Sequence, residues 1–431
     1  MKTTTVNIVT LGCSKNKVDS EHFAALLDGH FKVLHDSEKK TDIVIINTCG
    51  FIGDAQEESV DTILEYAQLR KNNKIKSLYV VGCLVQRFKK DLQAEIHEVD
   101  GFYGVNEMEK LASDILHTEV KQGYNCDRIL STPSHYAYLK ISEGCNRRCA
   151  FCAIPLIRGE HVSVPMQNLL EEAENLAKKG VKELILIAQD LTYYGIDIDG
   201  KQHIVELVEA LAKIDGIEWI RLHYGYPQGF PDELLDLMRD NPKICNYIDL
   251  PLQHVNTEIL KRMRRGVTHE QTKGFVENVR HHVPDIAFRT TFIVGFPGET
   301  ETDFNELCDF VREMRFERVG VFAYSPEQGT KAYEMEDDVP DDVKQQRVDT
   351  LMAIQQDIAL EINEKRVGKV EKVLVDRLED DFYIARSQYD SPEVDDEILI
   401  PADTELKIGD FVNVRITQAD FFDCYAEIFK S

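Results

Sequence analysis

The stretch ISEGCNRRCAFCAIPLIRG, residues 141–159, holds three cysteines, Cys145, Cys149 and Cys152. Thiolates spaced this closely are typical ligands of soft metals, chiefly zinc and iron–sulfur clusters. Three ligands leave a tetrahedral site one short, and a structural zinc site completed by His161 is one way to close it. The stretch lacks the paired Cys-x-x-Cys knuckles typical of structural zinc, so an iron–sulfur site with an open position is favoured.

Around this stretch the chain alternates short β-rich segments with amphipathic helical patterns. The strand candidates are YAYLKIS (136–142), ELILIAQ (183–189), IEWIRLHYG (217–225), NYIDLPL (246–252), IAFRTTFIVG (286–295) and RVGVFAY (318–324). Such alternation predicts a parallel sheet with right-handed crossovers, and six units are fewer than the eight of a closed barrel. We therefore expect an open, partial (β/α)6 barrel in residues 131–364, with the cysteine loop after its first strand.

A second cysteine triad lies in the first hundred residues, where three β-rich runs, VNIVTLGC, DIVIINTC and SLYVVGC, end at Cys13, Cys49 and Cys83. Helical patterns separate the runs, which predicts a parallel α/β domain in residues 1–120. Ligands of such sheets bind beyond the carboxyl ends of the strands, so the three thiols should converge. Buried packing is the alternative for a cysteine, but one at each of three strand ends favours metal binding.

The C-terminal residues 366–431 change character. Four segments show the alternation of apolar and polar residues typical of strands: KVEKVLVDRL, FYIARSQ, EILIPA and FVNVRITQA. They predict a small antiparallel β-barrel of the oligonucleotide-binding type. This segment has 8 Lys/Arg and 16 Asp/Glu, a net charge of −8. The polar stretch KQGYNCDRILSTPSH (121–135) reads as a linker between the first two domains.

Composition indicates the compartment of the protein and the kind of partner it would bind. No apolar run reaches the length of a membrane span, and the start MKTTTVNIVT lacks the features of a signal peptide, so we expect a cytoplasmic protein with no membrane contact. Ten cysteines in a reducing compartment favour metal binding over disulfides. Four of them match neither triad and are expected to be ordinary thiols: Cys126, Cys245, Cys308 and Cys424. The net charge of −26 favours a positively charged partner or a small molecule.

The segment CNRRCAFC (145–152) matches the CxxxCxxC motif of the radical S-adenosylmethionine enzymes, which this part of the chain resembles. The resemblance implies that the three cysteines hold a [4Fe–4S] cluster whose open iron binds S-adenosylmethionine. Four residues are candidates for binding that cofactor: Phe151, Gly295, Glu299 and Gln189. Phe151 occupies the family's aromatic position near the adenine, Gly295 and Glu299 belong to a glycine-rich strand end, TFIVGFPGE, and Gln189 ends the second strand candidate.

The segments LGCSKN, NTCGF and GCLVQR resemble the signature of the methylthiotransferases within that family, and the C-terminal barrel is similar to their TRAM domain. The resemblance implies a second [4Fe–4S] cluster on Cys13, Cys49 and Cys83, where the inserted sulfur is handled. One S-adenosylmethionine would donate a methyl group and another would supply the radical. The sequence identifies no catalytic acid or base.

Members of this family differ mainly in substrate. One branch modifies an adenosine beside the tRNA anticodon, and the other modifies the β-carbon of an aspartate in the twelfth small-subunit ribosomal protein. Three segments resemble the ribosomal-protein branch: ISEGCNRRCAFCAIP, YIDLPLQHVN and FRTTFIVGFPGE. An acidic TRAM barrel also suits a basic protein better than tRNA. The cluster KRMRRG (261–266) is the main counter-evidence, although a solvated helix face or complement to the helix dipole explains it.

We therefore predict an aspartate methylthiotransferase with two [4Fe–4S] clusters and S-adenosylmethionine as cofactors. Its expected partners are a basic ribosomal protein, free or on an assembling ribosome, a sulfur donor and an electron donor. Methylthiolation of tRNA adenosine is the alternative reaction. A non-catalytic protein with structural zinc and a nucleic-acid-binding barrel is the alternative from another class.

Overall fold

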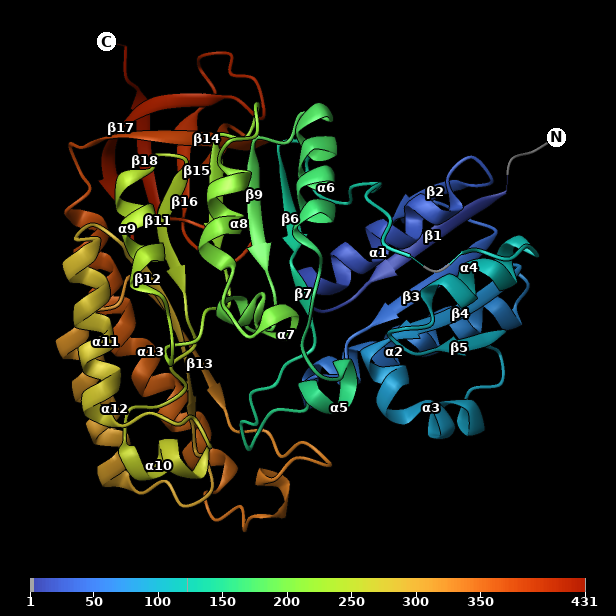
Figure 1. The fold of residues 1–431 in the computed structure, drawn as a ribbon, viewed down its shortest axis with the longest axis horizontal. Helices are drawn as coiled ribbons and strands as arrows, with labels where there is room; N and C mark the ends of the chain where they lie inside the picture. The colour runs from blue at the N-terminus through green and yellow to red at the C-terminus, as the bar shows by residue number, and fades with distance from the viewer. Residues whose placement is uncertain (1–3, 122, 431) are drawn as a thin grey trace.

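A computed structural model of the chain describes residues 4–121 and 123–430, and its N-terminal part is an α/β domain (Figure 1). The strands are β1 Thr5–Thr10, β2 Lys32–His35, β3 Ile43–Thr48, β4 Ser77–Gly82 and β5 Gly101–Tyr103, all parallel in the order β2-β1-β3-β4-β5. Helices α1 Ser14–Leu27 and α4 Met108–Leu116 cover one face, and α2 Gly53–Lys71 and α3 Cys83–Glu95 cover the other. The predicted parallel domain is confirmed, with β2 and β5 as added edge strands.

The central part is a six-stranded parallel sheet whose strands neighbour one another in chain order. Its strands are β6 Tyr136–Lys140, β9 Glu183–Ile187, β10 Trp219–Leu222, β11 Ile244–Asp249, β12 Ala287–Val294 and β13 Arg318–Ala323. Its larger helices are α6 Met166–Lys178, α8 Ile204–Leu211, α9 Asp232–Asp240, α11 His269–His282, α12 Glu301–Met314 and α13 Asp341–Glu364. Because β6 and β13 lie at opposite edges, the barrel is open, as predicted.

Shorter elements decorate the edge of this sheet that carries the strand ends. They are β7 Ser142–Glu143, α5 Ile154–Arg158, β8 Val162–Ser163, the 3-10 turn η1 Leu191–Tyr193, α7 Ile196–Asp199, α10 Thr257–Arg262 and the 3-10 turn η2 Ala332–Glu334. Helix α5 extends from the central part to α3 of the N-terminal domain (Figure 1). The chain after the first strand therefore forms part of the boundary between the two domains.

The C-terminal part is a closed barrel in the order β14-β15-β16-β18-β17. Its strands are β14 Val370–Glu379, β15 Phe382–Ser387, β16 Glu397–Pro401, β17 Phe411–Ala419 and β18 Asp423–Ile428. All pairs are antiparallel except β16 with β18, which is parallel. Closure removes the free edges that a small sheet would otherwise expose.

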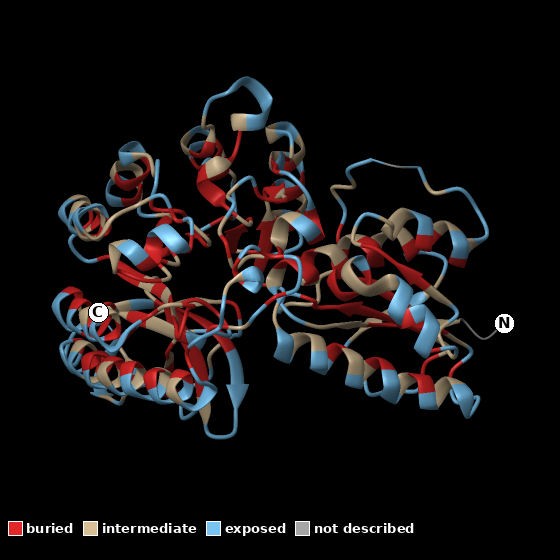
Figure 2. Ribbon diagram, turned by 90° about the horizontal axis from the view of Figure 1, so that it is seen from below, coloured by how far each residue is buried: buried red, intermediate tan, exposed pale blue. Residues whose placement is uncertain are grey.

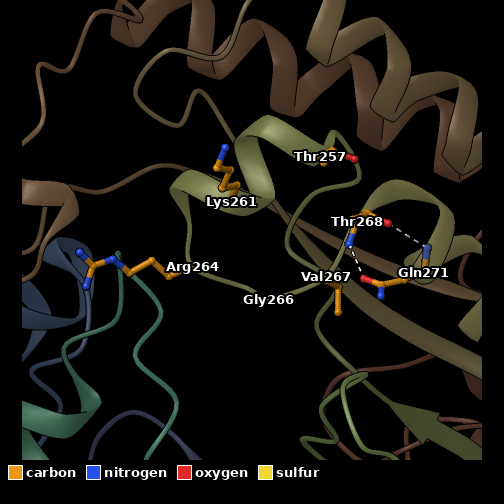
Figure 3. A pocket seen from close by; sticks show the side chains of 7 residues that line it. All are labelled: Thr257, Lys261, Arg264, Gly266, Val267, Thr268 and Gln271. Atoms are coloured by element: carbon orange, nitrogen blue, oxygen red, sulfur yellow. Dashed lines mark hydrogen bonds between the residues drawn. The ribbon is translucent and has the colours of Figure 1, made fainter.

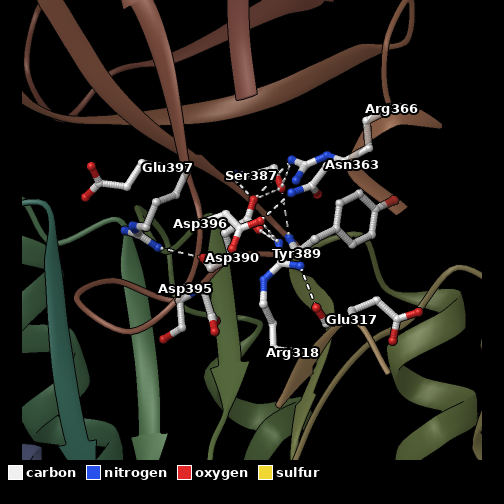
Figure 4. A network of polar contacts seen from close by, with 12 residues as sticks. Glu317, Arg318, Asn363, Arg366, Ser387, Tyr389, Asp390, Asp395, Asp396 and Glu397 are labelled. Carbon is white, nitrogen blue, oxygen red and sulfur yellow. Dashed lines mark hydrogen bonds and ion pairs between the residues drawn. The ribbon is translucent and has the colours of Figure 1, made fainter. Parts of the chain in front are cut away.

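Buried polar contacts hold the three parts together. Burial follows the sheets and the helix faces turned toward them (Figure 2). In the predicted linker 121–135, of which residue 122 lies outside the described residues, Arg128 is buried and pairs with Glu21 of α1 and Glu172 of α6. Arg318 joins the barrel through Asp390 at 2.7 Å (Figure 4). The predicted domain limits remain predictions. Within the described residues, no helix combines the length and apolar character needed to span a bilayer.

Candidate active site

The N-terminal cysteines follow three neighbouring strands whose ends lie at one edge of the sheet. Pairing sets Thr48 level with Gly82, so Cys49 and Cys83 follow at the same height. Cys13 caps the start of α1, just beyond the neighbouring strand β1. Since adjacent strands lie only about 4.8 Å apart, this register gathers the three cysteine loops at one place.

The close approach of two of these loops depends on Gly12. A Cβ atom at Gly12 would lie 2.7 Å from Cβ of Cys49 and 2.9 Å from its Sγ, and the backbone φ is +85°. Burial raises the pKa of the Cys49 thiol to about 11 and also raises the pKa of Cys83. Metal binding here must therefore displace protons from thiols that the apoprotein keeps neutral.

Asn16, in the first turn of α1, ties the cysteine loops to one another. Its Nδ2 donates to the carbonyl oxygens of Leu11 at 2.8 Å and Thr48 at 3.2 Å. Its Oδ1 accepts from Arg158 at 2.6 Å and lies 3.8 Å from Sγ of Cys83. Sequence reasoning missed this residue, although it ends the quoted segment LGCSKN.

The central triad lies on the loop between β7 and α5. The N–H of Cys152 donates to the carbonyl of Cys149 at 3.2 Å, which closes a turn between them. The N–H of Ala150 donates to the carbonyl of Met263 at 2.9 Å and fixes this turn against the chain after α10. Burial raises the pKa of Cys145 to about 11 and that of Cys152 to about 12.

The segment that follows the central triad contacts the N-terminal triad across the domain boundary. Ala153, the residue after the third central cysteine, packs in one apolar cluster with Cys83. Arg158, at the end of α5, places Nη2 3.4 Å from Sγ of Cys83 and Nη1 2.8 Å from both Asp19 and Glu143. A guanidinium of the central domain thus contacts a thiol of the N-terminal domain, which no motif in the sequence indicated.

Glu143 connects the Arg158 guanidinium to the central sheet. Burial opposes its ionisation, but Lys140 and Arg158 hold the pKa of Glu143 at about 2. Gln189 donates from Nε2 to Glu143 Oε1 at 2.7 Å. Among the described residues, Gln189 Oε1 has no hydrogen-bond partner although it is buried. A polar chain therefore runs from Cys83 through Arg158 and Glu143 to a predicted cofactor-binding residue.

A second arginine contacts the central triad. Arg265 places Nη1 3.5 Å from Sγ of Cys149 and stacks 4.2 Å from the ring centroid of Tyr226. Arg147 also lies over that ring, at 4.0 Å, and donates to Asp190 at 2.7 Å. Sequence reasoning had treated Arg265 only as part of the basic cluster KRMRRG, because its contact with Cys149 joins positions far apart in the chain.

Three of the predicted cofactor-binding residues gather near the central triad. Phe151 packs with Phe296 in one apolar cluster, which joins the cysteine loop to the turn after β12. Gly295 has φ +70°, and a Cβ there would meet a side chain of α13 at 2.3 Å. Burial raises the pKa of Glu299 to about 7, and Arg347 lies 3.0 Å from its Oε1. The geometry gives Glu299 a role in holding this turn, and the cofactor contacts stay predictions.

His161, the proposed fourth ligand of a zinc site, has other contacts. Its Nε2 lies 3.1 Å from Oγ of Ser163, and its ring meets Tyr193 edge-on at 5.0 Å. Across residues 4–121 and 123–430, no three His, Cys, Asp or Glu side chains meet closely enough for a single metal ion. An iron–sulfur cluster binds its thiolates through separate irons, so its ligands need not converge on one point.

Family comparisons match successive parts of the chain. They are the uncharacterized protein family UPF0004 at residues 5–104, the Radical SAM superfamily at 139–311 and the TRAM domain at 367–429. The radical S-adenosylmethionine methyltransferase TsrM from Kitasatospora setae superposes with a TM-score of 0.55 at 14% identity, covering 89% of this chain and 80% of its own. At that identity the likeness shows the fold.

Curated relatives cover almost the whole chain. Ribosomal protein uS12 methylthiotransferase RimO of Phocaeicola vulgatus is 52% identical over 99% of this chain and 100% of its own length. The protein of the same name from Cytophaga hutchinsonii is 51% identical over 99% of this chain and 98% of its own.

The open six-stranded barrel and its cysteine loop define a radical S-adenosylmethionine protein. The two flanking domains and the full-length identity narrow that class. The chain belongs to the RimO family.

Proposed function

We propose that this protein is an enzyme that adds a methylthio group to ribosomal protein uS12, at the β-carbon of an aspartate. The observation that carries the proposal is the contact of Arg158, on the helix that follows the central triad, with Cys83 of the N-terminal triad. Two centres that share a boundary suit a reaction that takes sulfur from one and a radical from the other. The names of the relatives agree with this substrate.

The residues fit two [4Fe–4S] clusters, one on each triad. Six thiols stand in two groups of three, and the charge-assisted contacts of Arg158 and Arg265 with one thiol of each group suit anionic thiolates. The buried oxygen of Gln189 and the buried Nε of Arg265, both without partners among the described residues, are free to meet a polar cofactor. When bound, a cluster with S-adenosylmethionine supplies a radical able to remove hydrogen from an unactivated carbon.

The chain's own residues would orient the reactants and exclude water. Arg158, through its contacts with Asn16 and Glu143, ties the helix after the central triad to the N-terminal cysteine loops. Phe151, which lies between two cysteines of the central triad, packs with Phe296 and brings apolar surface to this loop, which would help to keep solvent from a reactive species. Arg265 and Arg147, stacked on Tyr226, set positive charge beside the site.

A basic protein substrate agrees with the charge of the barrel, although less strongly than the count of −8 suggested. Asp390 and Asp395 are used in buried pairs with Arg318 and Arg289 of the central domain, and burial raises the pKa of Asp396 to about 7. The acids that remain exposed are Glu379, Asp380, Asp381, Glu393, Asp403, Glu405, Asp420 and Glu427. We propose that this surface meets uS12 in the cytoplasm, either free or on an assembling ribosomal particle, and that separate proteins supply sulfur and electrons.

The basic cluster was the main argument for tRNA, and its side chains divide between two surroundings. Arg265 is buried against Cys149, and Arg262 donates to the carbonyl of Pro297 at 3.2 Å. Lys261 and Arg264 line a cavity of 430 Å³ with residues of the loop before α11 (Figure 3). Three cations of the cluster are exposed: Lys261, Arg262 and Arg264. Three are few for binding a nucleic-acid backbone, since each phosphate contact adds to affinity.

The test is direct. Anaerobically reconstituted protein is incubated with S-adenosylmethionine, sulfide and a reductant, once with uS12 and once with tRNA, and both products are weighed. We expect a methylthio mass increment on one aspartate of uS12 and none on tRNA. Mass gain on tRNA alone would contradict the proposal. Iron analysis tests the cofactors: about eight irons per chain, reduced by half when either triad is replaced by alanine, fit two four-iron clusters.

A further inference from the structure

Lys15 is a mostly buried lysine that has no ion-pair partner among the described residues. It lies two residues beyond Cys13 in the first turn of α1, and only 7% of its surface is exposed. Its Nζ stands 3.0 Å from the ring centroid of Tyr224. Among the described residues, no carboxylate pairs with this ammonium and no oxygen accepts a hydrogen bond from it. A lysine in this position leaves its ammonium available to an anionic ligand, which would add a charge-assisted hydrogen bond.

Other buried cations near this face of the central sheet have acidic partners. Arg221 pairs with Glu183 at 2.8 Å, and Arg289 pairs with Asp249 at 3.1 Å. On α1 itself, Lys17 pairs with Glu393 at 2.7 Å. Lys15 differs from these neighbours because its direct contact is an aromatic ring, which stabilises a cation weakly compared with a carboxylate. The carboxylate of Asp249 lies near enough to interact with its charge but is paired with Arg289.

The position of Lys15 lies between the two triads. On one side it follows Cys13 along α1. On the other side it covers Tyr224, which has the unusual φ of +62° and stands two residues before Tyr226, the ring beneath Arg265 and Cys149. A ligand held by this ammonium would therefore lie between the cysteines of the two domains.

We propose that the Lys15 ammonium binds the side-chain carboxylate of the substrate aspartate, an assignment that rests on the proposed function. The carboxylate supplies the anion that the protein does not provide. The β-carbon of an aspartate is bonded directly to the carboxyl carbon, so anchoring that group positions the reacting carbon between the triads. Lys15 is thereby a specificity-determining residue that selects aspartate over its uncharged isostere asparagine.

The experiment compares two fluorescent peptides that span the target site of uS12, one with the aspartate and one with asparagine in its place. Their dissociation constants are measured by anisotropy with reconstituted holoenzyme, together with kcat and KM for the aspartate peptide. We expect wild-type enzyme to bind the aspartate peptide roughly 10- to 100-fold more tightly, as for a charge-assisted hydrogen bond. Lys15→Met should bring the ratio of the two dissociation constants near unity, whereas Lys15→Arg should keep a preference for aspartate.

Lys17→Met is the matched control, because it removes a charge from the same helix at a residue that has its own anion. It should keep the wild-type preference. Iron content and release of 5′-deoxyadenosine report whether each variant retains its cofactors, and Lys15→Gln replaces Lys15→Met should the latter lose iron. An unchanged preference in the uncharged Lys15 variants would overturn the assignment while leaving the proposed function intact. Wild-type enzyme that neither binds nor modifies the aspartate peptide would overturn both.

Discussion

Single residues decide how closely the cysteine loops approach. Gly12 is needed both for its φ of +85° and because a side chain would overlap Cys49. Gly29 has a similar φ, +75°, but nothing lies within 4 Å of the position its Cβ would take. Gly12 and Gly29 share the backbone strain that a side chain would bring at positive φ, but only Gly12 would also suffer steric overlap. Comparing variants at the two positions therefore separates the two effects.

Gly12→Ala should therefore remove the N-terminal cluster and spare the central one. We expect iron after reconstitution to fall from about eight to about four per chain, the loss of one four-iron cluster. Cleavage of S-adenosylmethionine should continue, because the central triad is untouched. Gly29→Ala, the control, should keep its iron and lose only about 1 kcal/mol of stability from strain at positive φ. Equal iron loss in both variants would contradict a steric role for Gly12.

At the scale of elements, helix α12 holds the turn that contains Gly295 and Glu299. The side chain of Thr300 accepts from the N–H of Asp303, and the Asp303 carboxylate accepts from the N–H of Thr300, which forms a capping box. This reciprocal pair satisfies two donors that the start of a helix otherwise leaves free. The geometry of the strand-end turn therefore depends on how α12 begins.

Thr300→Ala should lower the free energy of unfolding by about 1 kcal/mol, the usual cost of a lost N-cap. Urea titration of the apoprotein measures the change. Thr350→Ala is the control, because Thr350 lies exposed within α13 and bonds only to the Gln346 carbonyl of its own helix. Alanine favours a helix interior, so this variant should be unchanged or slightly more stable. The same loss in both variants would exclude the cap as the cause.

Element patterns were readable from the sequence where they were long or repeated. All six central strand candidates lie in one sheet, because buried parallel strands are continuous apolar runs. β2, β5 and β18 were missed because they are short edge strands or follow a turn without a strong apolar signal. Arg158, Asn16 and Arg265 were not recognised as part of the site because their contacts join residues 67 to 142 positions apart. Local patterns cannot indicate such pairs.

At the scale of the whole molecule, Arg128 fixes the linker between the first two domains. Its guanidinium is fully buried and pairs with Glu21 of α1 and with Glu172 of α6, at 2.9 Å for the latter. Burial favours the neutral guanidine, but the two carboxylates hold the pKa of Arg128 above its usual value. The segment predicted as a polar linker therefore contributes the cation of a three-membered ion network between the domains.

Arg128→Met should leave two buried carboxylates without a cation and destabilise the chain by about 3–5 kcal/mol. The midpoint of urea unfolding should fall accordingly. The triple variant with Glu21→Gln and Glu172→Gln should regain much of the loss, because no uncompensated charge remains. A single variant as stable as wild type would show that the network contributes nothing to docking of the domains.

The joint between the central domain and the C-terminal barrel depends on pH through Asp396. Burial raises the pKa of Asp396 to about 7, with the charge of Asp390 adding to the effect and Arg318 opposing it. Arg318 and Arg366 meanwhile help to hold the pKa of Asp390 at about 2 against the effect of burial. The folded chain thus keeps a proton on Asp396 between the unfolded value of 3.8 and about 7. Because the folded state binds more protons in that window, the contribution of Asp396 to stability falls as pH rises through it and is lost above it.

Asp396→Asn keeps the shape of the side chain and removes this titration. Relative to the variant, wild type should lose about 1.4 kcal/mol of unfolding free energy per pH unit between pH 5 and 7, and little more above pH 8. Urea titrations of both apoproteins across that range give the difference.

Asp390 does not disturb this difference, because its stabilising charge is lost only as pH falls toward about 2. Asp403→Asn, on an exposed turn of the same barrel, should give a difference that stays flat with pH. A flat difference for Asp396→Asn as well would mean that this carboxylate is already ionised at pH 5, and that charge pairing with Arg318, rather than a retained proton, holds the barrel to the central domain.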